Sequence, residues 1–122
     1  MPNDVFHFKQ FSVFQKDSAM KVSTDACLFG AIISPQTFPS NILDIGTGTG
    51  LLTLMLAQRF NSKVVAVEMD PMAASNAAYN FSQSPWKDRL FLINSDINKI
   101  NFTNKKCLLM FLSLITIKLI LT

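Results

Sequence analysis

Hydrophobic and polar positions along the chain predict three buried strands that alternate with two helices. The first strand is a short apolar run at 41–45, and the second, at 63–69, is a β-branched run typical of a buried parallel strand. The third strand covers 89–94. Two apolar stretches of helical length lie between them, at 51–60 and 71–81. This alternation predicts an α/β fold, with a parallel sheet, flanking helices and right-handed crossovers.

Capping residues mark the ends of the two predicted helices. Asp70 is a good N-cap and Pro71 suits the first helical position, so the second helix begins at residue 71. The first helix ends at the polar pair Asn61-Ser62. Helical spacing predicts that one face of the second helix carries three residues, with Ala77 beside them: Ala74, Ala78 and Phe81.

Residues 1–40 have a different pattern, which is rich in aromatic side chains. Phe6 and Phe8 alternate with polar residues, and this predicts a short strand or hairpin with one buried face. A short helix is predicted at about 26–33. We expect the aromatic rings to form a local core. The alternative is that some rings form a platform for an RNA base, together with lysines such as Lys9.

A glycine-rich turn, NILDIGTGTG at 41–50, joins the first strand to the helix that follows it. Glycine at every second position allows positive φ and lets a ligand approach without a Cβ in the way. The free N–H groups of the helix start then face that ligand, which favours a nucleotide-like cofactor. Leu51 stands where the dinucleotide fingerprint needs a small residue, so an NAD-dependent oxidoreductase is disfavoured.

The spacing D-x-G-x-G-x-G resembles the first motif of the S-adenosylmethionine-dependent methyltransferases with a Rossmann-like fold. The resemblance implies that Asp44 helps to hold the amino group of the cofactor. It also implies that five residues cradle the cofactor: Asp44, Gly46, Thr47, Gly48 and Gly50.

Two more carboxylates follow the later strands and are expected at the same edge of the sheet. Glu68, at the end of the second strand, can accept hydrogen bonds from both hydroxyls of a ribose. Asp96, after the third strand, can accept a hydrogen bond from an adenine amino group. A solvated strand end for Glu68 and a turn cap for Asp96 are the alternatives.

Composition narrows the class of protein without naming a substrate. The chain has 122 residues, enough for one small domain, and its net charge of +3 is compatible with a nucleic-acid partner but is weak evidence for one. Cys27 and Cys107 have neither metal-ligand nor disulfide spacing, so we expect no metal site and a reducing cytosol. The N-terminus does not read as a signal peptide. His7 is expected to be structural or exposed, because it has no predicted catalytic partner.

Segments outside the glycine turn carry a narrower resemblance. They include FKQF at 8–11, AMKV at 19–22, LFGA at 28–31 and SPW at 84–86. Over roughly residues 6–98 the chain resembles the bacterial tRNA1(Val) (adenine(37)-N6)-methyltransferase family. Membership implies a cytoplasmic enzyme that transfers a methyl group from S-adenosyl-L-methionine to the exocyclic N6 of an adenine next to a tRNA anticodon. We expect a tRNA substrate, a monomeric protein and no association with a membrane.

One part of the family pattern is absent. Members carry Asn-Pro-Pro-Tyr at the end of the fourth strand, where polar oxygens accept from the target amine and the aromatic ring stacks on the base. None of the 122 residues forms this motif, so the sequence assigns no catalytic residue and predicts a sheet that is incomplete at the C-terminus. The alternative function is therefore a catalytically inactive, truncated fragment that at most binds cofactor or RNA.

We divide the chain into an N-terminal segment with a pre-motif helix (1–40), a cofactor-binding core (41–106) and an apolar tail (107–122). The tail has three interpretations. It is a fourth strand and its continuation, a membrane segment, or out-of-frame sequence that replaces the catalytic half. The tail has 16 residues in all, with Lys118 among them, and a membrane span needs roughly 20 apolar residues. We favour the third interpretation.

Overall fold

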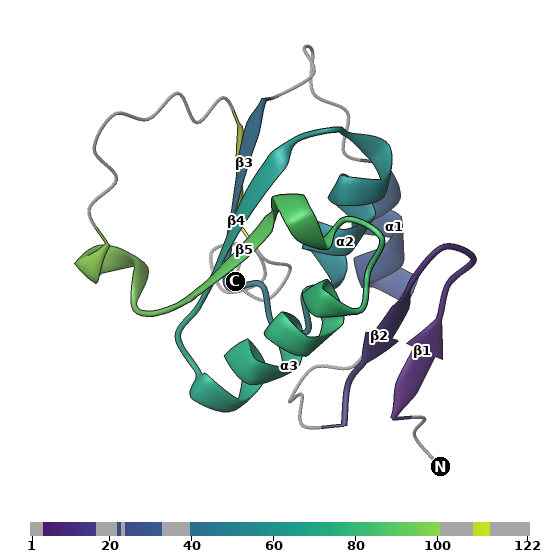
Figure 1. Cartoon of the computed structure of the whole chain (residues 1–122), viewed down its shortest axis with the longest axis horizontal. Helices are drawn as coiled ribbons and strands as arrows, with labels where there is room; N and C mark the ends of the chain where they lie inside the picture. Colours follow the sequence, from purple (N-terminus) through teal and green to yellow (C-terminus); the bar gives the residue numbers. More distant parts are fainter. Residues whose placement is uncertain (1–3, 17–21, 23, 33–39, 101–108, 113–122) are drawn as a thin grey trace.

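A four-stranded parallel sheet forms the centre of the computed structural model, which describes residues 4–16, 22, 24–32, 40–100 and 109–112 (Figure 1). The strand order is β5-β4-β3-β6, and every neighbouring pair is parallel. The α/β fold predicted from the alternation of strands and helices is confirmed. The bounds of the strands are β3 (Asn41–Ile45), β4 (Lys63–Glu68), β5 (Leu90–Asn94) and β6 (Leu109–Leu112).

Helices α2 (Leu51–Arg59) and α3 (Pro71–Ser82) connect β3 to β4 and β4 to β5. Both connections lead in the same direction across the sheet, so right-handed crossovers put both helices on one face. Asp70 caps α3 as predicted, because its side chain accepts from the N–H of Ala73 at 2.9 Å. Short 3-10 turns, η1 (Lys87–Arg89) and η2 (Ile97–Lys99), flank β5.

A hairpin and a short helix add a second layer beside α2 and α3 (Figure 1). The hairpin consists of β1 (Val5–His7) and β2 (Ser12–Phe14), which pair antiparallel as the alternation at the N-terminus predicted. Helix α1 (Thr24–Ile32) packs against α2 at Gly30, where an added Cβ would lie 2.5 Å from the sulfur of Met55. Glycine at this position therefore lets the two helices approach closely.

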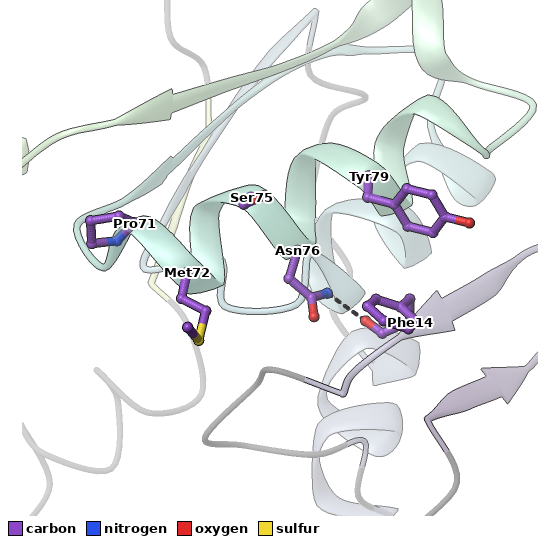
Figure 2. A pocket seen from close by; sticks show the side chains of 6 residues that line it. All are labelled: Phe14, Pro71, Met72, Ser75, Asn76 and Tyr79. Atoms are coloured by element: carbon purple, nitrogen blue, oxygen red, sulfur yellow. Dashed lines mark hydrogen bonds between the residues drawn. The ribbon is translucent and has the colours of Figure 1, made fainter.

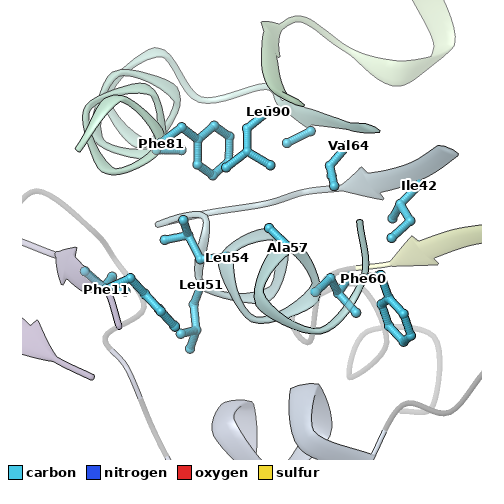
Figure 3. Packing of buried hydrophobic residues seen from close by; sticks show 13 residues of the cluster. Phe11, Ile42, Leu51, Leu54, Ala57, Phe60, Val64, Phe81 and Leu90 are labelled. Carbon is cyan, nitrogen blue, oxygen red and sulfur yellow. The ribbon is translucent and has the colours of Figure 1, made fainter. Parts of the chain in front are cut away.

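One hydrophobic core joins the hairpin, the helices and the sheet. Figure 3 shows Phe81 of α3 next to Leu90 of β5, and Leu54 and Ala57 on the side of α2 that faces β4. Leu54 has no exposed surface and Ala57 is 1% exposed. Aromatic rings continue this core into the hairpin, where Phe11 stacks on Phe8 at 4.6 Å and meets the edge of Trp86 at 5.7 Å between ring centroids.

The residues predicted to share one face of α3 differ in burial. Ala74, Ala77 and Phe81 are buried, but Ala78 is exposed, and two asparagines are buried in its place, Asn76 and Asn80. The reason is that α3 faces the hairpin as well as the sheet, and both asparagines bind the backbone of Phe14. Helix α1 likewise begins at Thr24, two residues before the predicted start.

The apolar tail is described only at residues 109–112. These residues form β6, which pairs with β3 in parallel, as the fourth-strand interpretation of the tail requires. The remainder of 107–122 lies outside the described residues. Within the part of the chain that the structure describes, no helix combines the length and the apolar character that a membrane crossing needs.

Candidate functional site

The glycine turn between β3 and α2 has a conformation that side chains would oppose. Gly46, Gly48 and Gly50 have φ values of 72°, 59° and 88°, all in the left-handed region that favours glycine. The N–H groups of Gly46 and Thr47 both donate to the carbonyl of Val67 in β4, at 2.7 and 3.1 Å. The turn is therefore fixed to the carboxyl end of the neighbouring strand.

Space around the turn differs sharply between two of its glycines. A Cβ added at Gly48 would meet no atom within 4 Å, so this part of the turn borders open space. A Cβ added at Gly50 would lie 2.5 Å from the ring of Phe81. Gly50 is the N-cap of α2 and provides no side-chain cap, so the first N–H groups of this helix depend on other partners.

Asp44 lies under the turn with no exposed surface. Its Oδ2 accepts hydrogen bonds from the hydroxyls of Thr47, at 2.8 Å, and Thr53, at 2.7 Å. No residue that the structure describes donates a hydrogen bond to its Oδ1. The carboxylate thus binds the turn to the first turn of α2 and keeps one buried acceptor free.

Burial raises the pKa of the Asp44 carboxyl above its ordinary value of 3.8. The two threonine hydroxyls act in the opposite direction, and the nearby charge of Glu68 adds to the rise. Desolvation is the largest of these effects, since a buried charge loses its hydration. A cationic group next to Oδ1 would relieve this penalty.

Glu68 ends β4 and faces the turn from the neighbouring strand. Its Oε1 accepts from the N–H of Gly48 at 2.9 Å, and its Oε2 accepts from the N–H of Asp70 at 3.0 Å. Each carboxylate oxygen retains a further lone pair, so the side chain can still accept from a ligand. The structure therefore brings Gly48 and Glu68 together across two strands, as the strand order predicts.

Asp96 lies beyond β5 and caps the turn η2, where its side chain accepts from the N–H of Asn98 at 2.9 Å. The segment before it is held to Glu68, because the N–H of Ser95 and the amide of Asn94 both donate to the Glu68 carbonyl, at 3.1 and 2.8 Å. Asp96 thus follows the strand that neighbours Glu68, and it has the capping role that was the alternative for it.

The residues of the turn fit a cofactor with a cationic group and a sugar. The unpartnered Oδ1 of Asp44 suits a positively charged donor, and the carboxylate of Glu68 suits paired hydroxyls. The open space beside Gly48 lets a ligand lie against the backbone. Among the described residues, no group of three or more His, Cys, Asp or Glu side chains could hold a metal ion.

Two residues of this site were not predicted from the sequence. Thr53 is a fully buried polar residue in an otherwise apolar helix segment, and that contrast was the available signal. Asn80 donates to the carbonyl of Thr49 at 2.7 Å, so α3 contacts the glycine turn directly. No local pattern indicates this contact, because the two residues are 31 positions apart.

Comparison with known sequences identifies the family. The family described as "Methyltransferase domain" matches residues 42–119. Two proteins named tRNA1(Val) (adenine(37)-N6)-methyltransferase, from Cytophaga hutchinsonii and Vibrio vulnificus, are 51% and 50% identical over 107 and 101 residues. These matches cover 87% and 82% of this chain and 45% and 42% of the relatives. The chain therefore spans less than half the length of these curated relatives.

Solved structures show the same fold. TYW2 of P. horikoshii, in complex with MeSAdo, superposes with a TM-score of 0.67 at 20% identity, covering 83% of this chain and 40% of that chain. An RNA methyltransferase from Salinibacter ruber, in complex with S-adenosyl-L-homocysteine, gives a TM-score of 0.54 at 19% identity, covering 60% and 46%. The Rossmann-like fold predicted from the motifs is confirmed. The chain belongs to the methyltransferase domain family, and its predicted resemblance to the bacterial tRNA1(Val) (adenine(37)-N6)-methyltransferases is confirmed.

Proposed function

We propose that this chain carries the cofactor-binding part of an S-adenosyl-L-methionine-dependent tRNA (adenine-N6)-methyltransferase. The observation that carries the proposal is the buried, half-partnered carboxylate of Asp44 under a turn of three left-handed glycines. Relatives at about half identity, named for methylation of adenine 37 in tRNA1(Val), support it.

In this proposal, each predicted residue has a role that its surroundings support. Asp44 Oδ1 accepts from the amino group of the cofactor, while Oδ2 keeps the turn in place. The turn residues Gly46, Thr47, Gly48 and Gly50 provide backbone that the cofactor can approach. Glu68 accepts from the ribose hydroxyls.

Asp96 is proposed to accept from the adenine amino group. The hydrogen bond that it accepts from the N–H of Asn98 leaves acceptor capacity on the carboxylate.

The bound cofactor supplies a methyl group on a cationic sulfonium. The protein's part is to hold that methyl group in line with the target nitrogen, and positioning of this kind lowers the barrier. The target is the exocyclic amine of an unpaired adenine near the tRNA anticodon, in the cytoplasm. We propose that the protein acts on this tRNA as a monomer.

The second candidate function is cofactor or RNA binding without turnover. It concerns these 122 residues by themselves, none of which forms Asn-Pro-Pro-Tyr. The two candidates share the cofactor site and differ in chemistry, so one pair of assays separates them.

Calorimetry with S-adenosyl-L-methionine tests the cofactor site. The wild-type chain is expected to bind, and Gly48→Val is expected to lose binding, because its branched side chain enters the open space beside the turn. Asn61→Ala, at an exposed position between α2 and β4, is the matched control and should bind normally. Equal affinity in all three proteins would contradict the cofactor site.

A methyl-transfer assay on unmodified tRNA then separates the candidates. Incorporation of labelled methyl into adenine N6 supports the enzyme. Cofactor binding without incorporation supports the binding fragment.

A further inference from the structure

An open cavity of about 640 Å³ lies between helix α3 and the hairpin, outside the cofactor turn (Figure 2). None of the predicted cofactor residues lines it. Its walls are flat or flexible apolar groups with two polar side chains among them: Phe14, Pro71, Met72, Ser75, Asn76 and Tyr79.

Asn76 gives this cavity an unsatisfied acceptor. The residue is only 4% exposed, and its Nδ2 donates to the carbonyl of Phe14 at 2.5 Å. A flipped amide would place two oxygens against each other, so this contact fixes the orientation of the side chain. The remaining atom, Oδ1, is buried and accepts no hydrogen bond from the described residues. Figure 2 shows the amide pointing from α3 towards the hairpin. A ligand group that reaches this oxygen needs an N–H or O–H donor to satisfy it.

The apolar walls favour a planar ring as that ligand. Tyr79 is 53% exposed and meets the edge of Phe14, with ring centroids 5.5 Å apart. Met72 is 60% exposed, and its thioether can pack on an aromatic face. Exposed aromatic and thioether side chains next to a free acceptor match a heteroaromatic ring that carries an amino group.

A second cavity continues the first along the hairpin. It has a volume of about 470 Å³, shares Phe14 and Tyr79 with the first, and includes Lys9. Among the described residues that line the two cavities, none is Asp or Glu. The two adjoining cavities therefore share two aromatic side chains, and the second also has the cationic side chain of Lys9. This combination suits a negatively charged single strand of linked bases.

We propose that the cavity at Asn76 binds an unpaired RNA base that neighbours the target adenine. The base stacks on Tyr79 and donates its exocyclic amino group to Asn76 Oδ1, and its strand continues past Lys9. This inference rests on the proposed function, which supplies an RNA substrate with unpaired bases.

At its other end, the first cavity is lined by the first two residues of α3. Pro71 and Met72 directly follow Asp70, whose N–H binds the carboxylate of Glu68. A base held here is thus a few residues from the proposed ribose site. That is where a flanking nucleotide must lie when an adjacent base enters the reaction site.

Fluorescence anisotropy with two labelled probes tests the proposal, with no cofactor present. One probe is a single-stranded oligoadenylate. The other is an oligomer of the same length in which unsubstituted purine replaces every adenine, so that it lacks the exocyclic amino group. Wild-type protein is expected to bind oligoadenylate about three- to tenfold more tightly, the range of one hydrogen bond. Asn76→Ala should abolish this preference, because it removes the acceptor.

Variants at exposed positions test stacking without risk to the fold. Tyr79→Ala is expected to weaken oligoadenylate binding about tenfold, since it removes one stacking face, and Tyr79→Phe should retain most of the affinity. Phe91→Ala is the matched control, because Phe91 is an exposed aromatic residue on β5, away from both cavities. It should bind like wild type.

The outcomes separate this inference from the proposed function. Wild-type protein that binds neither probe, or Tyr79→Ala that binds as tightly as Phe91→Ala, would overturn the base site while calorimetry still reports cofactor binding. Loss of oligoadenylate binding in Tyr79→Ala, with no cofactor binding in any protein, would keep the base site and reject the methyltransferase.

Discussion

Asp44 has no exposed surface, and both hydrogen bonds that it accepts within the described ranges are made to Oδ2. Both donors, Thr47 and Thr53, are neutral hydroxyls, so the hydrogen bonds that Asp44 accepts within the described part of the chain bring no positive charge to the carboxylate. Desolvation therefore raises the pKa of this group in the folded chain. The residue best suited to receive a cationic ligand is also one that destabilises the empty protein when it ionises.

The first prediction concerns the pH dependence of stability. Because the pKa of Asp44 is raised in the folded chain, the unfolded chain binds fewer protons at this residue than the folded chain does once the pH exceeds about 3.8. Stability is therefore lost as the pH rises from that value through the higher folded pKa. The side chain in Asp44→Asn cannot ionise. The free energy of unfolding of this variant should therefore increase relative to that of wild type as the pH rises from 3.8 through the folded pKa. Urea titrations of both proteins without cofactor measure the difference, and a difference that does not vary with pH would refute the prediction.

The second prediction compares two glycines of the same turn. Gly48→Ala should cost about 1–2 kcal/mol of stability, because alanine opposes a left-handed backbone. Gly50→Ala should cost about 1–3 kcal/mol more, since its Cβ would collide with the Phe81 ring. Cofactor affinity should fall at least tenfold in Gly48→Ala, because its Cβ enters the open space of the site. Urea titration and calorimetry on both variants test the two effects separately.

At this scale, the sequence predicts residues whose chemistry is local. The glycines, Asp44 and Glu68 could be identified because turn spacing and strand ends are features of short segments. Thr53 and Asn80 could not, because their partners are set by how α2 and α3 pack. The position of Asp96 after its strand could also be predicted. Of its two expected roles, acceptor for the adenine amino group and turn cap, the structure shows the capping bond from Asn98.

The elements meet at the backbone of one residue, Phe14. Asn80 of α3 accepts from the Phe14 N–H at 2.7 Å and donates to its carbonyl at 2.9 Å. The same amide also donates to the carbonyl of Thr49 in the glycine turn. Hairpin, helix and turn are thus joined by a side chain that is only 2% exposed.

The third prediction follows from this junction. Asn80→Ala should lower the free energy of unfolding by about 2–4 kcal/mol, because it leaves buried backbone groups without partners. Asn61→Ala, at an exposed position, serves as the control and should change stability little. Denaturant titration compares them, and similar values for the two variants would show that the junction does not stabilise the fold.

The presence of the strands and helices could be predicted from the sequence, but the rotation of a helix about its own axis could not. Strands and helices appeared at the expected places because each carries its own hydrophobic period and caps. The rotation of α3 depends on a partner elsewhere in the sequence, so the exposure of Ala78 could not be predicted from helical spacing. The partner is the hairpin, and its backbone attracts Asn76 and Asn80.

For the whole molecule, a ligand that binds only the folded chain must raise its stability. The fourth prediction is that S-adenosyl-L-homocysteine, at about 100 times its dissociation constant, adds about 2.7 kcal/mol to the free energy of unfolding. Thermal denaturation should show a higher Tm for wild type and no change for Gly48→Val. NAD at the same concentration is the control, and a larger shift with NAD would favour the oxidoreductase that Leu51 disfavours.

The shared contact at Phe14 has a consequence for the order in which ligands bind. A base in the cavity at Asn76 touches the residue whose backbone Asn80 joins to the glycine turn. Any shift of Phe14 caused by RNA is therefore transmitted to the loop that is proposed to hold the cofactor. Thermodynamic reciprocity then requires that the cofactor change the affinity for RNA by the same factor as RNA changes the affinity for the cofactor.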